Sequence, residues 1–202
     1  MTLWRDKHPL ILASQSRARQ MLLANAGIRF EAIPAEIDER AVQQASRLSE
    51  PGEIAALLAR EKALSVSMRQ PGKYVVGADQ TLALENRLFS KPSGRAAAAE
   101  QLGDLAGRSH QLHSAVAVAR DGKILFEAVA AARMTMRQLS GAEIRTYLDE
   151  AGEAVSSSVG AYQLEKFGIH LFEKVEGDYF TILGMPLLPL LAFLRHQAFL
   201  KE

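Results

Sequence analysis

Residues 10–23 bring together side chains that can bind an anion. Ser14 and Ser16 follow four apolar residues and are of the types that favour the N-cap of a helix. Arg17 and Arg19 then fall in the first helical turn, where the dipole is already positive and a further cation needs an anion to offset it. Free N–H groups, hydroxyls and guanidinium groups at one helix start are typical of a phosphate-binding site. The alternative is a pair of solvated arginines on an ordinary helix.

Several carboxylates are candidate ligands for a metal ion. Asp79 lies at the polar end of an apolar stretch, and Glu36, Asp38 and Glu39 lie together in an acidic segment. Carboxylate oxygens are hard ligands that suit Mg²⁺ or Mn²⁺. The alternatives are that Asp79 forms a turn at the end of a strand and that the acidic segment is a solvated loop.

One lysine interrupts an apolar helical face. Residues 53–68 predict a helix in which Lys62 follows Leu58 by four residues and Ile54 by eight, so that it lies on the buried side. Its ammonium group either extends to water at the edge of that face or points into a site. The spacing is compatible with both outcomes.

The sequence excludes several common kinds of site. His110 and His113 are three residues apart on a predicted strand, so they point to opposite faces and cannot bind one zinc ion together. There is no cysteine, which excludes disulfides, thiolate metal ligands and cysteine nucleophiles. Walker, Gly-x-Gly-x-x-Gly and Gly-x-Ser-x-Gly motifs are also absent, so ordinary P-loop, Rossmann and nucleophile-elbow sites lose their main support.

The composition is that of a globular protein. The chain has 202 residues, of which 48% are hydrophobic and 23% charged, and its net charge is +1. These values predict one domain, residues 1–202, with an ample core and no electrostatic surface for nucleic acid polymers. The polar N-terminus and the lack of an apolar run of about 18 residues argue against a signal peptide or a membrane span. We therefore expect a cytoplasmic protein.

Strands and helices alternate along the chain. Strands are predicted at 10–13, 30–33, 74–82, 110–119, 123–136 and 169–175, and helices at 16–26, 53–68, 96–105, 140–150 and 186–200. Asp121-Gly122 predicts a tight hairpin between two of the strands. The alternation with a long hairpin favours an α/β fold with a mixed sheet over a purely parallel one.

The segment Leu-Ala-Ser-Gln-Ser-Arg-Ala-Arg (12–19) resembles the Leu-Ala-Ser-x-Ser-Pro-x-Arg signature of the Maf family, nucleoside triphosphate pyrophosphatases related in fold to the inosine triphosphate pyrophosphatases. Six further motifs follow in the family's order: Ile37-Asp38-Glu39, Leu58-Ala-Arg-Glu-Lys62-Ala, Gly77-Ala-Asp79, Lys91-Pro92, Gly107-Arg-Ser-His110 and Gly184-Met-Pro-Leu187. Each motif is weak alone, but together they cover nearly the whole chain. The resemblance implies a mixed twisted central sheet flanked by helices, with two lobes around a cleft.

The resemblance is closest to the 7-methyl-GTP pyrophosphatase branch of the family. That branch has Gln after the motif aspartate, as at Gln80 here, and Glu at the position of Glu165. The sequence departs from the pattern at Arg17, where the signature has proline, at Ala18, where the branch has a bulky residue, and at Lys166, where it has glycine. These departures leave the choice among 7-methyl-GTP, CTP, UTP and another modified nucleotide open.

The family resemblance implies hydrolysis of a nucleoside triphosphate between its α and β phosphates, a house-cleaning reaction that yields a nucleoside monophosphate and pyrophosphate. It assigns catalytic roles to Asp79, as general base, and Lys91, phosphate binding to Ser16, Arg19 and Lys62, and a divalent Mg²⁺ or Mn²⁺ ion to Glu39 and Asp79. It assigns substrate selection to Ala18, Gln80 and Glu165. A carboxylate accepts hydrogen bonds from the N1–H and amine of guanine, although a cytosine amine would serve as well.

Two expectations concern partners. The apolar C-terminal helix and the habit of the family predict a homodimer. A second hypothesis is a nucleotide-binding regulator of septum formation that acts through a protein partner, since Maf proteins are linked to septation. A pure binder would need Arg19, Lys62 and Lys91 but not Asp79.

Overall fold

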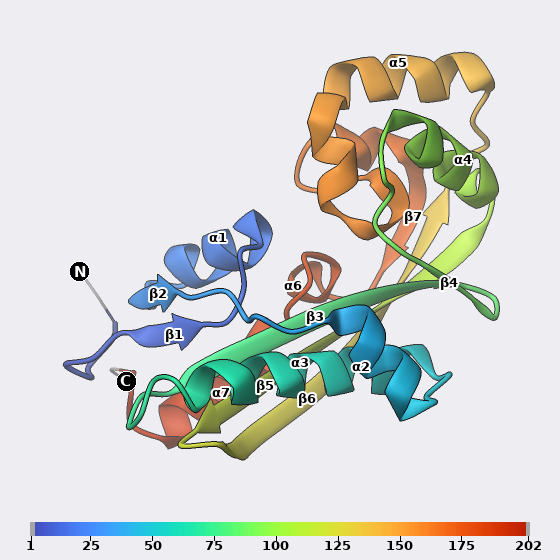
Figure 1. Cartoon of the computed structure of the whole chain (residues 1–202). Coiled ribbons are helices and arrows are strands. Elements are labelled where there is room, and N and C mark those ends of the chain that lie inside the picture. Colours follow the sequence, from blue (N-terminus) through green and yellow to red (C-terminus); the bar gives the residue numbers. More distant parts are fainter. Residues whose placement is uncertain (1–2, 201–202) are drawn as a thin grey trace.

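The computed structural model describes residues 3–200 and contains a seven-stranded mixed sheet in the order β2-β1-β3-β5-β6-β7, with β4 paired to β3 (Figure 1). The strands are β1 (Leu10–Leu12), β2 (Phe30–Ala32), β3 (Val75–Leu84), β4 (Arg87–Phe89), β5 (Ser109–Arg120), β6 (Lys123–Met136) and β7 (Phe172–Glu176). β1 pairs in parallel with β2 and β3, and the other pairs are antiparallel. The predicted α/β fold with a mixed sheet is confirmed.

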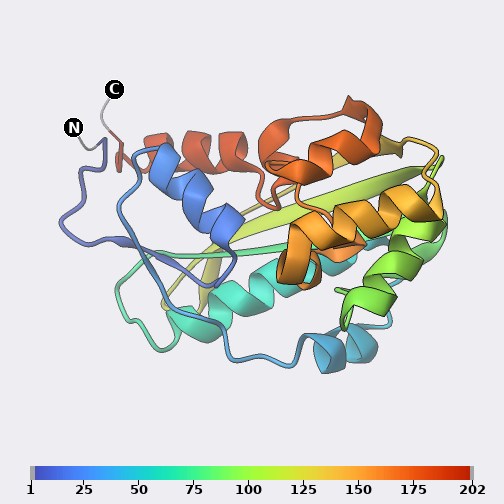
Figure 2. The same ribbon diagram turned by 90° about the horizontal axis from the view of Figure 1, so that it is seen from above.

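Helices cover both faces of this sheet. They are α1 (Arg17–Asn25), α2 (Glu39–Ser46), α3 (Pro51–Ser67), α4 (Arg95–Leu105), α5 (Gly141–Ala151), α6 (Tyr179–Ile182) and α7 (Leu187–His196), with 3₁₀ helices η1 (Gly152–Ser157), η2 (Val159–Ala161) and η3 (Phe167–Leu171). Figure 2 shows α3 and α7 on opposite sides of the sheet. None of these helices is both long and apolar enough to span a membrane within residues 3–200.

Two predicted elements were wrong in detail. The acidic segment is not a plain loop, because Asp38 caps helix α2 by accepting a hydrogen bond from the N–H of Ala41, and Glu39 is the first residue of that helix. None of the residues of α2 is buried, so this segment has no buried apolar face whose periodicity would predict a helix. The strand predicted at 169–175 begins only at Phe172, because the preceding residues form the 3₁₀ helix η3.

The long strands carry a lobe at each end (Figure 1). In the base lobe, α1 and α7 pack with β1 around a core that includes Leu10, Leu23 and Leu190. In the distal lobe, α4, α5 and the 3₁₀ helices pack around a core that includes Leu102 and Tyr162. Because β3 supplies Val76 to the first core and Leu82 to the second, its middle residues lie where the lobes meet.

Helix α3 lies unusually close to the sheet. Alanines of α3, including Ala59 and Ala63, pack on alanines of β5. At Gly77 a side chain has no room, since a Cβ there would lie 2.1 Å from the carbonyl oxygen of Ala59. This close approach of backbone to backbone brings the alanine-rich face of α3, which also carries Lys62, next to the middle of β3.

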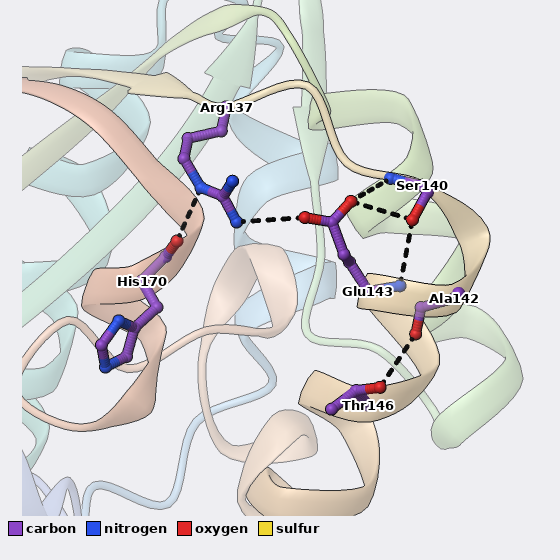
Figure 3. A network of polar contacts seen from close by, with 6 residues as sticks. All are labelled: Arg137, Ser140, Ala142, Glu143, Thr146 and His170. Atoms are coloured by element: carbon purple, nitrogen blue, oxygen red, sulfur yellow. Dashed lines mark hydrogen bonds and ion pairs between the residues drawn. The ribbon is translucent and has the colours of Figure 1, made fainter.

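A polar network anchors the distal lobe to the end of β6 (Figure 3). Ser140 and Glu143 form a capping box at the start of α5, and the hydrogen bonds from Ser140 hold the pKa of the Glu143 carboxyl below its usual value. Arg137 donates to the Glu143 carboxylate at 3.4 Å and to the carbonyl oxygen of His170 at 2.9 Å. The network therefore joins β6, α5 and η3.

Candidate active site

The middle of β3 has an open edge. On that side β1 pairs only as far as Val76, and β4 begins its pairing at Leu82, so the ladders to described strands leave residues 77–81 bound to β5 alone. Asp79 and Gln80 lie in this gap and point to opposite faces of the sheet. The two predicted site residues on β3 are therefore next to the only stretch of this edge, within residues 75–84, that no neighbouring strand occupies.

Lys62 links two carboxylates at the α3 face of the gap. Its ammonium nitrogen lies 2.6 Å from Oδ1 of Asp79 and 2.8 Å from Oε1 of Glu39. Lys62 and Asp79 are each 7% exposed, whereas the side chain of Glu39 is 55% exposed. The lysine on the apolar face of the helix thus points into a site and does not extend to water.

Arg19 extends this cluster from the start of α1. Ser16 is the N-cap, as predicted, with its Oγ 3.5 Å from the N–H of Arg19, and Ser14 Oγ accepts from the Arg19 guanidinium at 3.3 Å. Burial lowers the pKa of Arg19, and the negative charges of Asp79 and Glu39 oppose that change. Arg19 therefore interacts electrostatically with both carboxylates, although the hydrogen bonds described for its guanidinium go to Ser14 and Gly184. Arg17 is exposed, so the alternative of a solvated arginine holds for this residue.

Gln80 and Ala18 are placed less simply. The half-buried side chain of Gln80 donates to the carbonyl oxygens of Thr181 and Ile182, each at 3.0 Å, on the face opposite Asp79. Ala18 packs against the core of the base lobe. Its part in substrate selection stays a prediction.

Lys91 and Glu165 come from the distal side. Lys91 is exposed and follows Phe89, which is opposite Leu82, so the antiparallel chain leaves β4 in the direction of Gln80. Glu165 is half-buried in the turn between η2 and η3. Burial raises the pKa of Tyr147 to about 12, and the charge of Glu165 adds to this rise. Among the described contacts, none joins Lys91 or Glu165 to Asp79.

The acidic residues match one kind of metal site. Within residues 3–200 no group of three acidic or histidine side chains forms a ready cage. Glu39 and Asp79 do offer two carboxylates around one cation position. Mg²⁺ commonly takes one or two carboxylates and completes its coordination with substrate phosphates and water. The donor set fits a divalent ion that binds together with a triphosphate.

The sequence did not reveal several residues that support the site. Ser114 and Thr181 are fully buried polar residues, and Ser114 Oγ donates to the carbonyl oxygen of Thr181 at 2.7 Å. Arg19 Nε donates to the carbonyl oxygen of Gly184 at 2.8 Å. The one available signal was that Ser114 alternates with the apolar residues Leu112, Val116 and Val118 on one face of β5. The motif at Gly184 was recognised, but not its contact with Arg19.

A separate pocket of about 580 Å³ lies at the start of α3. Glu50, His113 and Arg133 are among the residues that line it, and none of the predicted site residues does. Its mixed charges indicate no particular ligand. The buried charges around Lys62 are the better indication of a functional site, because they are costly to maintain without one.

Comparison with known proteins identifies the family. Residues 9–197 match the family model described as "Maf-like protein". The chain belongs to this family. The Maf-like chain is 69% identical to a nucleoside triphosphate pyrophosphatase of Bradyrhizobium diazoefficiens over 98% of both chains. It is 52% identical to a 7-methyl-GTP pyrophosphatase of Brucella abortus, over 93% of this chain and 96% of that protein.

The family predicted from seven short motifs is thus confirmed, and the names of these relatives agree with the predicted pyrophosphatase activity. A HAM1 protein from Coxiella burnetii, 19% identical over 63% of this chain and 72% of its own, superimposes with a TM-score of 0.39, too low to bear on the site.

Proposed function

We propose that this Maf-like protein hydrolyses a nucleoside triphosphate to a nucleoside monophosphate and pyrophosphate. The observation that carries the proposal is the buried ammonium of Lys62 between the carboxylates of Asp79 and Glu39, with Arg19 near enough to interact electrostatically with both. Positioning and electrostatic stabilisation are what phosphoryl transfer requires of a protein. A cluster with alternating charges at the open edge of β3 meets both needs.

In the proposed reaction a water oxygen forms a bond to the α phosphorus while the bridging bond to the β phosphate breaks. Asp79 orients the water and takes its proton, and pyrophosphate leaves with the bridging oxygen. Lys62 holds Oδ1 of Asp79 at 2.6 Å, which restricts the rotation of the carboxylate. Arg19 and the Ser16 hydroxyl bind phosphate oxygens at the start of α1, and Lys91 neutralises the leaving group.

The same proposal includes a divalent ion, Mg²⁺ or Mn²⁺, held by Glu39 and Asp79. When bound, such an ion neutralises phosphate charge and polarises the phosphoryl oxygens. Lys62 would then release one carboxylate to the ion and keep contact with the other or with the triphosphate. The two carboxylates that Lys62 now contacts are the residues that make this exchange possible.

The proposed substrate is 7-methyl-GTP or a similar modified or canonical nucleotide. The carboxylate of Glu165 can accept the N1–H and amine protons of guanine, and its charge suits a cationic 7-methylated ring. The relative from Brucella abortus that carries this activity in its name supports the choice at 52% identity. CTP and UTP are the alternatives that the substrate screen must separate.

A cytoplasmic homodimer completes the proposal. The apolar side chains of α7, among them Leu190 and Leu194, pack into the core of their own chain, whereas Leu188 is 56% exposed. The apolar character of α7 is therefore explained by packing within one chain, and the proposed homodimer rests on the resemblance to the family.

A screen for pyrophosphate release tests the proposal. The panel contains the ordinary nucleoside triphosphates and 7-methyl-GTP with Mg²⁺ or Mn²⁺, and the variant Asp79→Asn is measured beside the wild type. We expect pyrophosphate and monophosphate in equal amounts from the wild type and a loss of turnover of about 10²- to 10⁴-fold in the variant. Binding of nucleotide by folded wild-type protein without any turnover would contradict the enzyme and favour the regulator of septum formation.

A further inference from the structure

The carboxamide of Gln80 has one orientation in this fold. Its nitrogen lies 3.0 Å from the carbonyl oxygens of Thr181 and Ile182 and 3.0 Å from Oγ of Ser114. A carbonyl oxygen can only accept hydrogen bonds, so the atom facing Thr181 and Ile182 must be the donor nitrogen and not the oxygen. Both N–H groups of Gln80 are therefore used inside the protein.

Ser114 and α6 make that orientation rigid. Ser114 is completely buried and donates to the same Thr181 carbonyl oxygen at 2.7 Å. Thr181 is also completely buried, and its N–H and hydroxyl both bond to the carboxylate of Asp178, the N-cap of α6. Buried hydrogen-bonded groups resist rearrangement because leaving one unpaired is costly.

The oxygen of the same carboxamide is free to accept. It has no hydrogen bond to a residue within 3–200, and it is not among the buried atoms of this region that lack a partner. A Cβ on Gly184 would lie 3.7 Å from this oxygen and 3.4 Å from the Arg19 guanidinium, and Gly184 has a φ of +95° that favours glycine. Gln80 Oε1 and Arg19 thus flank the same glycine.

We propose that Ser114 is a positioning residue that, with the carbonyl groups of Thr181 and Ile182, turns Gln80 so that it offers only an acceptor to the base of the substrate. This inference rests on the proposed function for the presence of a nucleotide, and it deepens that function by naming the edge that is selected.

An acceptor at Gln80 selects bases that donate. Guanine presents N1–H and an amine on one edge, and Gln80 Oε1 can accept a hydrogen bond from either group. A uracil edge places carbonyl oxygens on both sides of a single N–H, so one carbonyl would face an acceptor. A threonine hydroxyl at position 80 could donate as well as accept and would not impose this choice.

Equilibrium binding with two probes tests the inference without requiring turnover. The probes are 7-methyl-GTP and ribose 5′-triphosphate, which keeps the phosphates and lacks the base. In Gln80→Met we expect the affinity for 7-methyl-GTP to fall about 10- to 100-fold and that for ribose triphosphate to stay within about twofold. The binding ratio is the affinity for 7-methyl-GTP divided by that for ribose triphosphate. In Ser114→Ala this ratio should fall about 3- to 10-fold, because the Gln80 carboxamide keeps its two carbonyl partners and loses the hydroxyl.

Ser109→Ala is the matched control. Ser109 lies on β5 like Ser114, but its hydroxyl contacts Thr135 and not Gln80. Its ratio should equal that of the wild type. With a turnover assay the loss in Gln80→Met should appear in KM more than in kcat.

An unchanged binding ratio in either Gln80→Met or Ser114→Ala, or an equal loss of affinity for both probes in Ser114→Ala, would overturn the inference. Failure of the wild type to hydrolyse 7-methyl-GTP while the binding ratio responds as expected would contradict the proposed function alone.

Discussion

Two buried polar pairs each include one residue of the central sheet, Asp79 on β3 in the first pair and His110 on β5 in the second. Lys62 and Asp79 are joined at 2.6 Å, and His110 Nε2 and the hydroxyl of Tyr162 at 2.8 Å. All four residues are less than a tenth exposed. The first pair is charged and has further charged neighbours in Glu39 and Arg19, whereas the second pair is neutral and is surrounded by apolar side chains.

The pKa shifts express the difference. Burial lowers the pKa of His110 to about 4 and raises that of Tyr162, so both are uncharged at neutral pH. Phe172 packs edge-on against Tyr162, and its ring centre lies 6.0 Å from that of His110. The neutral pair belongs to the core of the distal lobe, whereas the charged pair also contacts the exposed carboxylate of Glu39. Burial of polar groups by itself therefore does not identify a catalytic site.

The largest difference between the pairs is expected on removing the cation of the first. Lys62→Met leaves the Asp79 carboxylate buried beside an apolar side chain, which should destabilise the fold by about 3–5 kcal/mol and abolish measurable turnover. The double variant Lys62→Met/Asp79→Asn should recover most of the stability and none of the activity. Urea unfolding and pyrophosphate release measure both. A double variant as unstable as the single one would show that the charge pair is not the cause.

The second pair should respond to acid. His110 has a folded pKa of about 4 against about 6.5 unfolded, so between these values the unfolded chain binds a proton that the folded chain does not. The contribution of His110 to the free energy of unfolding is present in full above pH 6.5. It is lost as the pH falls to 4, which lowers the free energy of unfolding by about 3 kcal/mol. In His110→Gln the free energy of unfolding, measured across this pH range, should no longer show this decrease. The exposed His196 provides the control, since His196→Gln should keep it.

Tyr162→Phe is a smaller test of the neutral pair. The ring Nδ1 of His110 already lacks a described partner, and the variant would leave Nε2 without one as well. We expect a loss of about 1–3 kcal/mol in the free energy of unfolding, with kcat for an accepted nucleotide near that of the wild type. A fall in kcat as large as that in Asp79→Asn would place the second pair in the catalytic machinery and end the distinction.

The smallest expected effect tests whether burial or short distance sets the strength of an ion pair. Arg87 and Asp104 are joined at 2.6 Å, as close as Lys62 and Asp79, but the arginine side chain is 60% exposed. Arg87→Ala should cost less than about 1 kcal/mol and should cost still less in high salt. Thermal unfolding at two salt concentrations measures this. A loss equal to that in Lys62→Met would mean that short distance, and not burial, sets the strength of these pairs.

The separate motifs could be read from the sequence because each depends on a local pattern. The charge at the start of α1, the lysine on an apolar face and the hairpin at Asp121-Gly122 all follow from spacing along one element. Helix α2 escaped prediction because it buries no side chain. The orientation of the Gln80 carboxamide could not be predicted, because its three hydrogen-bond partners are contributed by β5 and α6, up to 102 residues away.

By itself, the sequence determined the family and the alternation of strands and helices, and it predicted Asp79, Lys62, Arg19 and Ser16 as candidate site residues. Only the tertiary structure decided that Lys62 joins Asp79 to Glu39 and that Arg19 reaches Gly184, 165 residues away. The physical reason is that residue type and spacing dictate what a side chain can do on its own element. Which partners it meets depends on how closely the elements pack, as at Gly77, where the absence of a side chain allows α3 to approach β3.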